Sequence, residues 1–365
     1  MSKNVSSFGP WRGFNLLEKF TVRRNMLFVE LDFQRMAKWG FDFVRLPMDY
    51  RCWIIDGDYY RINEKVLREI DQAVEFGRKY GIHVNINFHR APGYCINPPP
   101  EPLSLWRDKE AMEACEYHWR LFAERYRDVP SSQVSFNLVN EPLGNDVNRD
   151  RGTDMATYRR FVERMLRVIR EVDPDRLVIA DGLITRGRYE PVPEIDDPLF
   201  GQSFHMYEPA WLTHLGASWT YPWYIYDEQP EYPGVAPNLD KYLKEIPSDS
   251  PYRRAYLKYH GVRVDRDWLE NWMKPYLDLK EEKGVFVHCG ELGVYAKKVP
   301  RRSQLNWYRD VLGILSQHKI GWAQWNLRGP FGIINTGREE FHSETLSNGD
   351  RLDRELLDLI RGFLN

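Results

Sequence analysis

Residues 79–88 read KYGIHVNINF, a segment that joins the end of an amphipathic helix, through a glycine, to a short apolar strand. The same order of helix end, glycine and strand returns as KWGFDFVRLP at 38–47, EKGVFVHCGE at 282–291 and KIGWAQWN at 319–326. Glycine directly after a helix takes the left-handed conformation that turns the chain into the next element. We therefore expect the glycine of each segment to cap a helix.

Short apolar segments of this kind recur along the chain and predict the strands. Nearly continuous apolar strands are typical of a parallel sheet that is covered on both faces. No glycine-rich phosphate loop follows the first predicted strand, since WRGFNLLEKF at 11–20 contains neither GxGxxG nor GxxxxGK, which argues against a nucleotide-binding fold. Strands interleaved with helices over this length predict the α/β class, a (β/α)8 TIM barrel and a single domain over residues 1–365. The eight predicted strands are 11–16, 41–47, 82–88, 134–140, 177–181, 201–206, 285–291 and 321–326.

One segment interrupts this alternation. Between the strand at 201–206 and a helix near 267–283 lie about 60 residues that are rich in Trp, Tyr, Pro and Gly. A loop this long inside a compact domain is usually either functional or disordered. We expect residues 208–265 to form an insertion after the sixth strand that acts as a wall or lid at the barrel mouth.

Composition excludes several classes of function. The 365 residues are 42% hydrophobic and 28% charged, with a net charge of −2. A net charge this close to zero does not indicate binding to nucleic acid or to an anionic membrane. No apolar run approaches the roughly 18–20 residues of a membrane span. The N-terminus lacks the apolar core of a secretory signal, so we expect a cytoplasmic protein, or a secreted one if a leader was removed. The sequence leaves the oligomeric state open.

The four cysteines are scattered and form no CxxC pair. We therefore expect free, mostly buried thiols, which fit a reducing compartment.

Polar residues gather where the predicted strands end, and in a barrel the carboxyl ends of the strands carry the active site. The runs FNLVNEP at 136–142 and VFVHCGELG at 285–293 supply two glutamates, Glu141 and Glu291. Two carboxylates can cut a glycosidic bond, since one donates a proton to the leaving oxygen while the other attacks or stabilises the sugar carbon. The other strand ends supply Arg45, His89, Asn140, His205, Tyr207 and Trp325.

This ordered set resembles glycoside hydrolase family 5, the cellulase-like family of retaining enzymes in clan A. All eight positions of the family pattern have a match, and the resemblance runs from about Trp11 to the C-terminal helix. It implies that Glu141 is the general acid/base and that Glu291 is the nucleophile. It also implies that the other six residues bind substrate or tune these carboxylates. Trp325 would be the floor beneath the cleaved sugar, and His89 and His205 would hold hydroxyls or tune the carboxylates.

The nucleophile has to stay ionised, and two of the matched residues suit that requirement. Arg45 would stabilise the charge of Glu291 as an opposite charge, and Tyr207 would do so by a hydrogen bond. Asn140 would bond the sugar 2-OH, a contact that strengthens in the oxocarbenium-like transition state.

Each residue also has a structural interpretation. Arg45 alone could be an ordinary barrel ion pair, and Trp325 alone could belong to the core. Glutamates are mostly exposed, but glutamates that end buried strands are not typical surface residues, so the pair favours catalysis. His288 and Cys289 face opposite sides of their strand and cannot both converge with Glu291. We therefore expect neither a metal site nor a cofactor.

The sequence thus predicts a retaining glycoside hydrolase that cleaves β-linked glucan or gluco-oligosaccharide by double displacement, in the manner of an endo-β-1,4-glucanase. Alternatives are a β-mannosidase, a β-mannanase or another exo-acting β-glycosidase on short oligosaccharides. A catalytically inactive carbohydrate-binding barrel is the alternative from another class. A barrel aldolase would require a lysine at a strand end, and none is found there. The expected partner is a carbohydrate, and the motifs do not distinguish glucose from mannose or endo from exo action.

Overall fold

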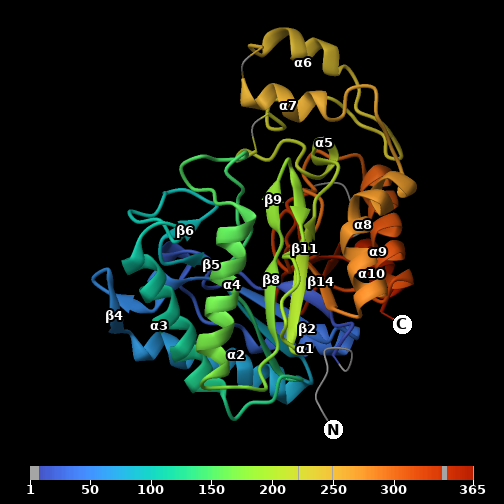
Figure 1. The fold of residues 1–365 in the computed structure, drawn as a ribbon. Coiled ribbons are helices and arrows are strands. Elements are labelled where there is room, and N and C mark those ends of the chain that lie inside the picture. The colour runs from blue at the N-terminus through green and yellow to red at the C-terminus, as the bar shows by residue number, and fades with distance from the viewer. Residues whose placement is uncertain (1–7, 221, 249, 339–342, 365) are drawn as a thin grey trace. The chain divides into compact units, whose positions relative to one another are not determined.

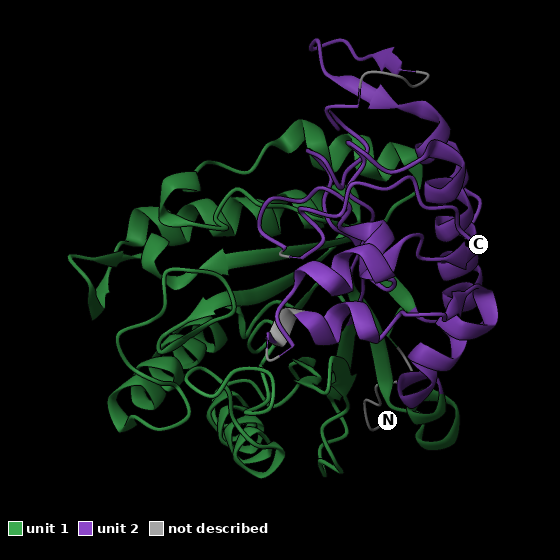
Figure 2. Ribbon diagram, turned by 90° about the horizontal axis from the view of Figure 1, so that it is seen from above, with its two compact units in different colours: residues 1–204, 278–290, 321–323 green, residues 205–277, 291–320, 324–365 purple. Residues whose placement is uncertain are grey.

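The computed structural model describes residues 8–220, 222–248, 250–338 and 343–364. The chain divides into two compact units, which Figure 2 shows in green and purple. Unit 1 comprises residues 1–204, 278–290 and 321–323, and unit 2 comprises residues 205–277, 291–320 and 324–365. The predicted range 1–365 includes residues outside the described ones, and the assignment of a single domain stays a prediction.

Eight parallel strands form a closed barrel, as the sequence predicts (Figure 1). Hydrogen bonds join them in the order β2-β1-β15-β14-β11-β8-β7-β5, and β5 pairs again with β2 to close the ring. Each strand overlaps one of the predicted strands. The strands are β1 Arg12–Asn15, β2 Phe43–Asp49, β5 His83–Ala91, β7 Val134–Asn137, β8 Val178–Asp181, β11 Phe200–Met206, β14 Phe286–Leu292 and β15 Gly321–Gln324.

Within the described ranges, helices follow seven of the eight barrel strands. They are α1 Glu30–Trp39, α2 Glu64–Tyr80, α3 Lys109–Tyr126, α4 Met155–Arg170, α8 Arg266–Lys283, α9 Arg301–Gln317 and α10 Arg354–Arg361. Short paired strands lie in the connections between the barrel strands and the helices. β3 Ile54–Ile55 pairs with β4 Asp58–Ile62, β6 Tyr94–Cys95 pairs with β5, and β16 Ser343–Thr345 pairs with β17 Arg351–Asp353.

The alternation of strand and helix fails after β8. Residues 182–199, all of them described, contain no helix and instead form an antiparallel hairpin of β9 Leu183–Thr185 and β10 Arg188–Glu190. Arg186 and Gly187 make its two-residue turn with φ of 48° and 73°, the conformation that tight hairpins require. The prolines in the PVPEIDDP segment that follows disfavour a helix there.

Three of the four predicted glycine caps are confirmed. Gly40, Gly81 and Gly284 have φ of 94°, 69° and 63°, and each follows the last residue of a helix. The prediction is wrong for Gly321, because α9 ends at Gln317 and Lys319 takes the left-handed conformation with φ of 52°. Gly321 begins β15 instead.

Close approach of two strands requires glycine at another position, Gly13 of β1. A Cβ built there lies 1.7 Å from the backbone oxygen of Phe43, its partner on β2. We expect Gly13→Ala to lower the free energy of unfolding by about 1–3 kcal/mol or more, measured by thermal denaturation, because the two backbones must separate. Gly313→Ala on α9 is the control, since its Cβ would meet the end of the flexible Arg266 side chain. An unchanged melting temperature for Gly13→Ala would contradict this close approach.

Aromatic rings fill the amino end of the barrel interior. The rings of Trp11 and His83 stack with their centroids 3.6 Å apart, and Phe43 lies 4.4 Å from His288. His83 Nε2 also lies 2.7 Å from Ser135 Oγ. Burial lowers the pKa of His83 to about 3, so this imidazole is neutral and structural.

The predicted insertion, residues 208–265, is folded where it is described. It contains α5 Ala210–Thr213, α6 Leu239–Glu245, α7 Pro251–Leu257 and a ladder of β12 Gly234–Val235 with β13 Arg263–Val264. Its buried Trp223 packs edge-on against Tyr256 and Tyr226, at 4.8 and 5.6 Å between centroids. The insertion thus has an aromatic core of its own, and its position as a wall or lid stays a prediction.

Among the described helices, none is both long and apolar enough to cross a membrane. All four cysteines are free and buried, as predicted: Cys52, Cys95, Cys115 and Cys289.

Candidate active site

Arg45 lies at the centre of a polar layer inside the barrel of unit 1. Its side chain extends from β2 and is 1% exposed. Its guanidinium donates to three amide oxygens: Nε to Asn137 Oδ1 at 3.0 Å, Nη1 to Asn15 Oδ1 at 3.1 Å and Nη2 to Asn140 Oδ1 at 2.8 Å. Nη2 also lies 3.7 Å from Asp181 Oδ2, which supplies the opposite charge that a buried arginine needs.

Asn140 is oriented by this arginine. Its side chain is fully buried, and its Oδ1 is occupied by Arg45. Its Nδ2 meets no hydrogen-bond partner among the described residues. A buried amide hydrogen without a partner is costly. Asn140 therefore offers a hydrogen-bond donor, held in a fixed orientation, to a bound ligand.

Glu141 follows in a conformation that the sequence does not reveal. β7 ends at Asn137, so the glutamate lies beyond the strand rather than at its last residue, and its φ is 47°. A left-handed conformation is strained for a residue other than glycine and persists where the surroundings hold it. Glu141 N donates to Asp181 Oδ2 at 3.1 Å, and Glu141 O accepts from the Tyr94 hydroxyl at 2.6 Å. Its half-buried carboxyl accepts, through Oε1, a 2.5 Å bond from the Tyr189 hydroxyl.

His89 of β5 lies beside a separate hollow of unit 1. Its Nε2 is 2.6 Å from Asn97 Oδ1, and its ring centroid is 4.4 Å from that of Phe20. The hollow measures about 550 Å³, and prolines and aliphatic carbons contribute to its wall. Its lining residues are Phe20, Thr21, Val22, Arg23, Arg51, His89, Arg90, Cys95, Asn97, Pro98 and Pro99.

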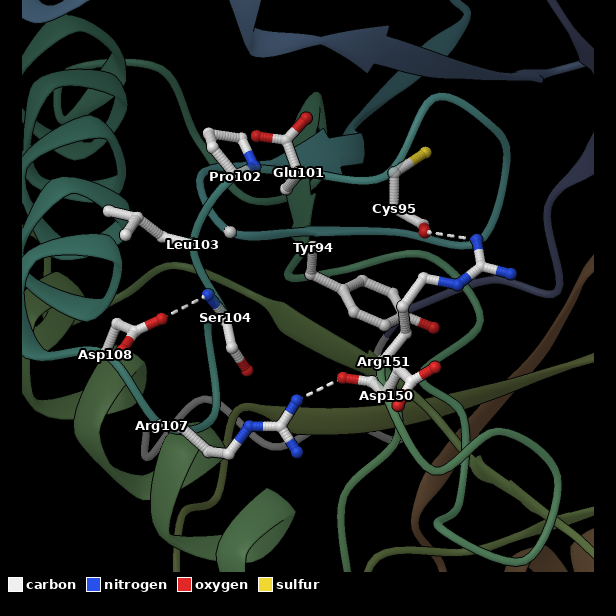
Figure 3. Close-up of a pocket in the computed structure, with 11 residues that line it drawn as sticks. Tyr94, Cys95, Glu101, Pro102, Leu103, Ser104, Arg107, Asp108, Asp150 and Arg151 are labelled. Carbon is white, nitrogen blue, oxygen red and sulfur yellow. Dashed lines mark hydrogen bonds between the residues drawn. The ribbon is translucent and has the colours of Figure 1, made fainter.

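A second cavity of unit 1, of about 270 Å³, is lined in part by Tyr94 (Figure 3). Arg151 lies beside the Tyr94 ring and donates from Nη1 to Ile96 O at 2.8 Å, and Arg107 donates to the backbone oxygen of Asp150. Burial raises the pKa of the Tyr94 hydroxyl far above its usual value, so it stays protonated and able to donate to Glu141. None of the eight residues of the predicted site lines this cavity.

Glu291 belongs to unit 2 and lies on β14, where it is 4% exposed. Its Oε2 accepts a 2.9 Å hydrogen bond from the Tyr207 hydroxyl and lies 3.5 Å from His205 Nδ1. The predicted bond between Tyr207 and Glu291 is therefore present in the structure. A stabilising effect of Arg45 on this carboxylate stays a prediction.

Trp325 belongs to an aromatic cluster of unit 2. It packs together with Tyr207 against Phe331 and Tyr295, and its backbone N–H donates to Leu292 O at 2.7 Å. Trp219, from the insertion, lies edge-on to Tyr295 with ring centroids 5.4 Å apart and is 58% exposed. An exposed tryptophan thus extends the cluster that contains Tyr207.

The metal-ligand types near Glu291 have structural contacts of their own. His288 Nε2 lies 3.2 Å from Trp11 O, and Cys289 is fully buried.

Sequence reasoning missed several residues of this layer. Asp181 ends the apolar run LVIAD and carries the same signal as the two glutamates, an acid after a buried strand. Asn137 lies within an apolar run and could have been found as a polar interruption of that run. Tyr189 comes from the short strand β10, which belongs to a separate two-stranded sheet, and gave no signal.

The family assignment rests on the length of the match. A model of the Cellulase family (glycosyl hydrolase family 5) matches residues 11–329. The chain belongs to glycosyl hydrolase family 5. This family-5 chain is 27% identical over 321 residues to Endoglucanase C of Acetivibrio thermocellus, covering 87% of this chain and 89% of that one. It is 24% identical over 298 residues to Cellodextrinase A of Ruminococcus flavefaciens, covering 80% and 76%.

Solved structures agree with the family. A crystal structure of a glycoside hydrolase matches with a TM-score of 0.82 and 33% identity, over 97% of this chain and 99% of that one. Endoglucanase Cel5A from the hyperthermophilic Thermotoga maritima matches with a TM-score of 0.67 and 20% identity over 98% of both chains, which supports the fold alone. This family-5 protein is a glycoside hydrolase, as the sequence predicts.

Proposed function

We propose that this glycoside hydrolase cleaves β-linked glucans or gluco-oligosaccharides with retention of configuration, through a covalent glycosyl-enzyme. The observation that carries the proposal is the buried carboxylate of Glu291, held on a barrel strand by the Tyr207 hydroxyl at 2.9 Å. A hydrogen bond to the ionised form favours the charged carboxylate that a nucleophile requires. The names of the relatives, an endoglucanase and a cellodextrinase, support a β-glucan as the substrate.

In the first step, an oxygen of Glu291 forms a bond to the anomeric carbon while the glycosidic C–O bond breaks. Glu141 transfers its proton to the departing oxygen, so the leaving group departs as a neutral alcohol. This assignment of roles is supported by the order of β7 and β14 in one parallel barrel, because the carboxyl ends of such strands share one face.

In the second step, Glu141 acts as a base and takes a proton from water. The water oxygen bonds to the anomeric carbon, the ester bond to Glu291 breaks, and both glutamates return to their starting state. Two inversions at one carbon restore the β configuration of the product.

Asn140 suits the role of binding the sugar 2-OH. Its Nδ2 lacks a partner among the described residues, and Arg45 holds the amide so that this group cannot turn away. A donor fixed in this way stabilises charge on the 2-oxygen without reorganising during the reaction.

Each unit has an apolar surface of its own that suits the packing of a sugar ring. Sugar rings present flat C–H faces that pack on aromatic and proline carbons. The hollow beside His89 offers such carbons in unit 1, and the exposed Trp219 offers them in unit 2. If the insertion closes one end of the cleft, as its length and aromatic content suggest, short oligosaccharides will be preferred.

A substrate panel tests the proposal. The panel comprises aryl β-glucosides and β-mannosides, their β-1,4-linked oligomers and the corresponding soluble polymers. We expect the highest kcat/KM on β-1,4-gluco-oligosaccharides, with the β anomer as the first product seen by NMR. Faster cleavage of mannosides would select the β-mannosidase or β-mannanase alternative, and release of single sugars from one end would indicate exo action.

Two further outcomes of the panel bear on the proposal. Equal activity on long polymers and on disaccharide-sized substrates would contradict a closed cleft. Binding of oligosaccharides without turnover of any substrate would identify an inactive carbohydrate-binding barrel.

A further inference from the structure

The hairpin of β9 and β10 ties Tyr189 to the segment that carries Glu141. Tyr189 lies on β10 directly opposite Ile184 of β9. Ile184 N donates to Pro142 O at 2.8 Å, and Ile184 O accepts from Gly144 N at 2.8 Å. The backbone that follows Glu141 is therefore bonded to the strand partner of Tyr189, so the two residues are held in register.

The contact between these two side chains differs from the contacts that hold the Glu141 backbone. Asp181 and Tyr94 bond to Glu141 N and O, so they fix where the backbone lies. Tyr189 bonds instead to the carboxyl oxygen Oε1 at 2.5 Å. The phenol therefore acts on the carboxyl group itself, and it can donate to Oε1 whether or not the other oxygen of Glu141 carries a proton.

We infer that Tyr189 is a positioning residue for proton transfer by Glu141, an inference that rests on the acid/base role proposed above. With Oε1 held by the phenol, rotation of the carboxyl group is restrained, and Oε2 is the oxygen that carries the proton to the leaving group. In the second step Oε2 takes a proton from the attacking water. The phenol proton stays on Tyr189 throughout, and no covalent bond to Tyr189 forms or breaks.

This role predicts an effect that depends on the leaving group. A phenolate of high basicity departs only when it is protonated, so its cleavage needs a well-aligned acid. A dinitrophenolate departs without help, so the step that forms the glycosyl-enzyme becomes independent of that alignment. Hydrolysis of the glycosyl-enzyme still needs the base, whichever leaving group was used.

Tyr189→Phe tests the inference, with phenyl and 2,4-dinitrophenyl β-glycosides of the sugar that the unmutated enzyme cleaves fastest. We expect kcat/KM on the phenyl glycoside to fall by about tenfold or more, and kcat/KM on the dinitrophenyl glycoside to stay within about twofold. The kcat on the dinitrophenyl glycoside should fall, and sodium azide should restore it, because azide attacks the glycosyl-enzyme without a base.

Tyr80→Phe is the matched control, since the Tyr80 hydroxyl also donates to a glutamate, Glu30 Oε1 at 2.9 Å, outside the proposed site. Its kinetics should equal those of the unmutated enzyme. An equal loss of kcat/KM on both glycosides for Tyr189→Phe would indicate structural damage and overturn the inference, as would no loss on either. Glu141→Ala in the same assays separates the two proposals. If Glu141→Ala loses the same kcat/KM on both glycosides, the acid/base role of Glu141 fails. If the loss depends on the leaving group in Glu141→Ala but not in Tyr189→Phe, only the inference about Tyr189 is overturned.

Discussion

Glu291→Ala is expected to reduce kcat by at least about 10⁴-fold on every substrate, because without a nucleophile the glycosyl-enzyme cannot form. The loss should be as large for dinitrophenyl glycosides as for oligosaccharides, since the missing bond is to carbon and leaving-group activation does not replace it. Steady-state kinetics with both substrate types measures the effect, and circular dichroism checks that the variant folds.

Azide gives this expectation a chemical readout. In the space left by the Glu291 carboxylate, azide should attack the anomeric carbon from the side that the carboxylate used, and the product should be the α-glycosyl azide. Glu270→Ala is the control, because Glu270 of α8 also pairs with a histidine, His318 Nε2 at 3.3 Å, which directly follows the last residue of α9. Retained activity in Glu291→Ala, or a β-glycosyl azide from it, would assign the nucleophile elsewhere.

Glu141→Ala is expected to lower kcat/KM on oligosaccharides by about 10²–10⁴-fold, the usual contribution of a general acid. On dinitrophenyl glycosides kcat/KM should change little, while kcat falls because the glycosyl-enzyme persists. Azide should raise that kcat and give the β-glycosyl azide, the anomer opposite to the one expected from Glu291→Ala. Comparison of the two azide products by NMR thus distinguishes the acid/base from the nucleophile.

The control for this variant is Glu30→Ala, which removes a glutamate bonded to Tyr80 and Lys79 outside the proposed site. It should retain full activity. Equal loss of activity by Glu141→Ala on activated and unactivated substrates would contradict the acid/base assignment.

The barrel was predictable because its strands are short, almost wholly apolar and separated by helices of clear period. All eight strands were located, and the bond from Tyr207 to Glu291 was anticipated from the order of residues at the strand ends. These features depend on local patterns, or on the rule that the carboxyl ends of parallel strands share one face of the barrel.

The features that escaped prediction depend on contacts between distant segments. Glu141 has a left-handed φ, and its backbone is held by Asp181, 40 residues later in the chain, and by Tyr94, 47 residues earlier. The hairpin that carries Tyr189 replaces a helix that the repeat predicts, and its two-residue turn at Arg186 lacks the usual Asn-Gly signal. The left-handed residue after α9 is Lys319 and not Gly321. Gly321 meets a different requirement, since a Cβ built there would lie 2.3 Å from Trp11 O.

The network around Arg45 has a consequence for how tightly the transition state can be bound. A mobile asparagine would lose rotational entropy each time it captured a hydroxyl group, and that loss would be subtracted from the binding free energy. Here the Arg45 guanidinium of β2 bonds to the side-chain amides of Asn15, Asn137 and Asn140 and lies beside the Asp181 carboxylate of β8. These contacts hold Asn140 in one orientation before substrate binds. The entropy is therefore lost once, when the chain folds, and not again in each catalytic cycle.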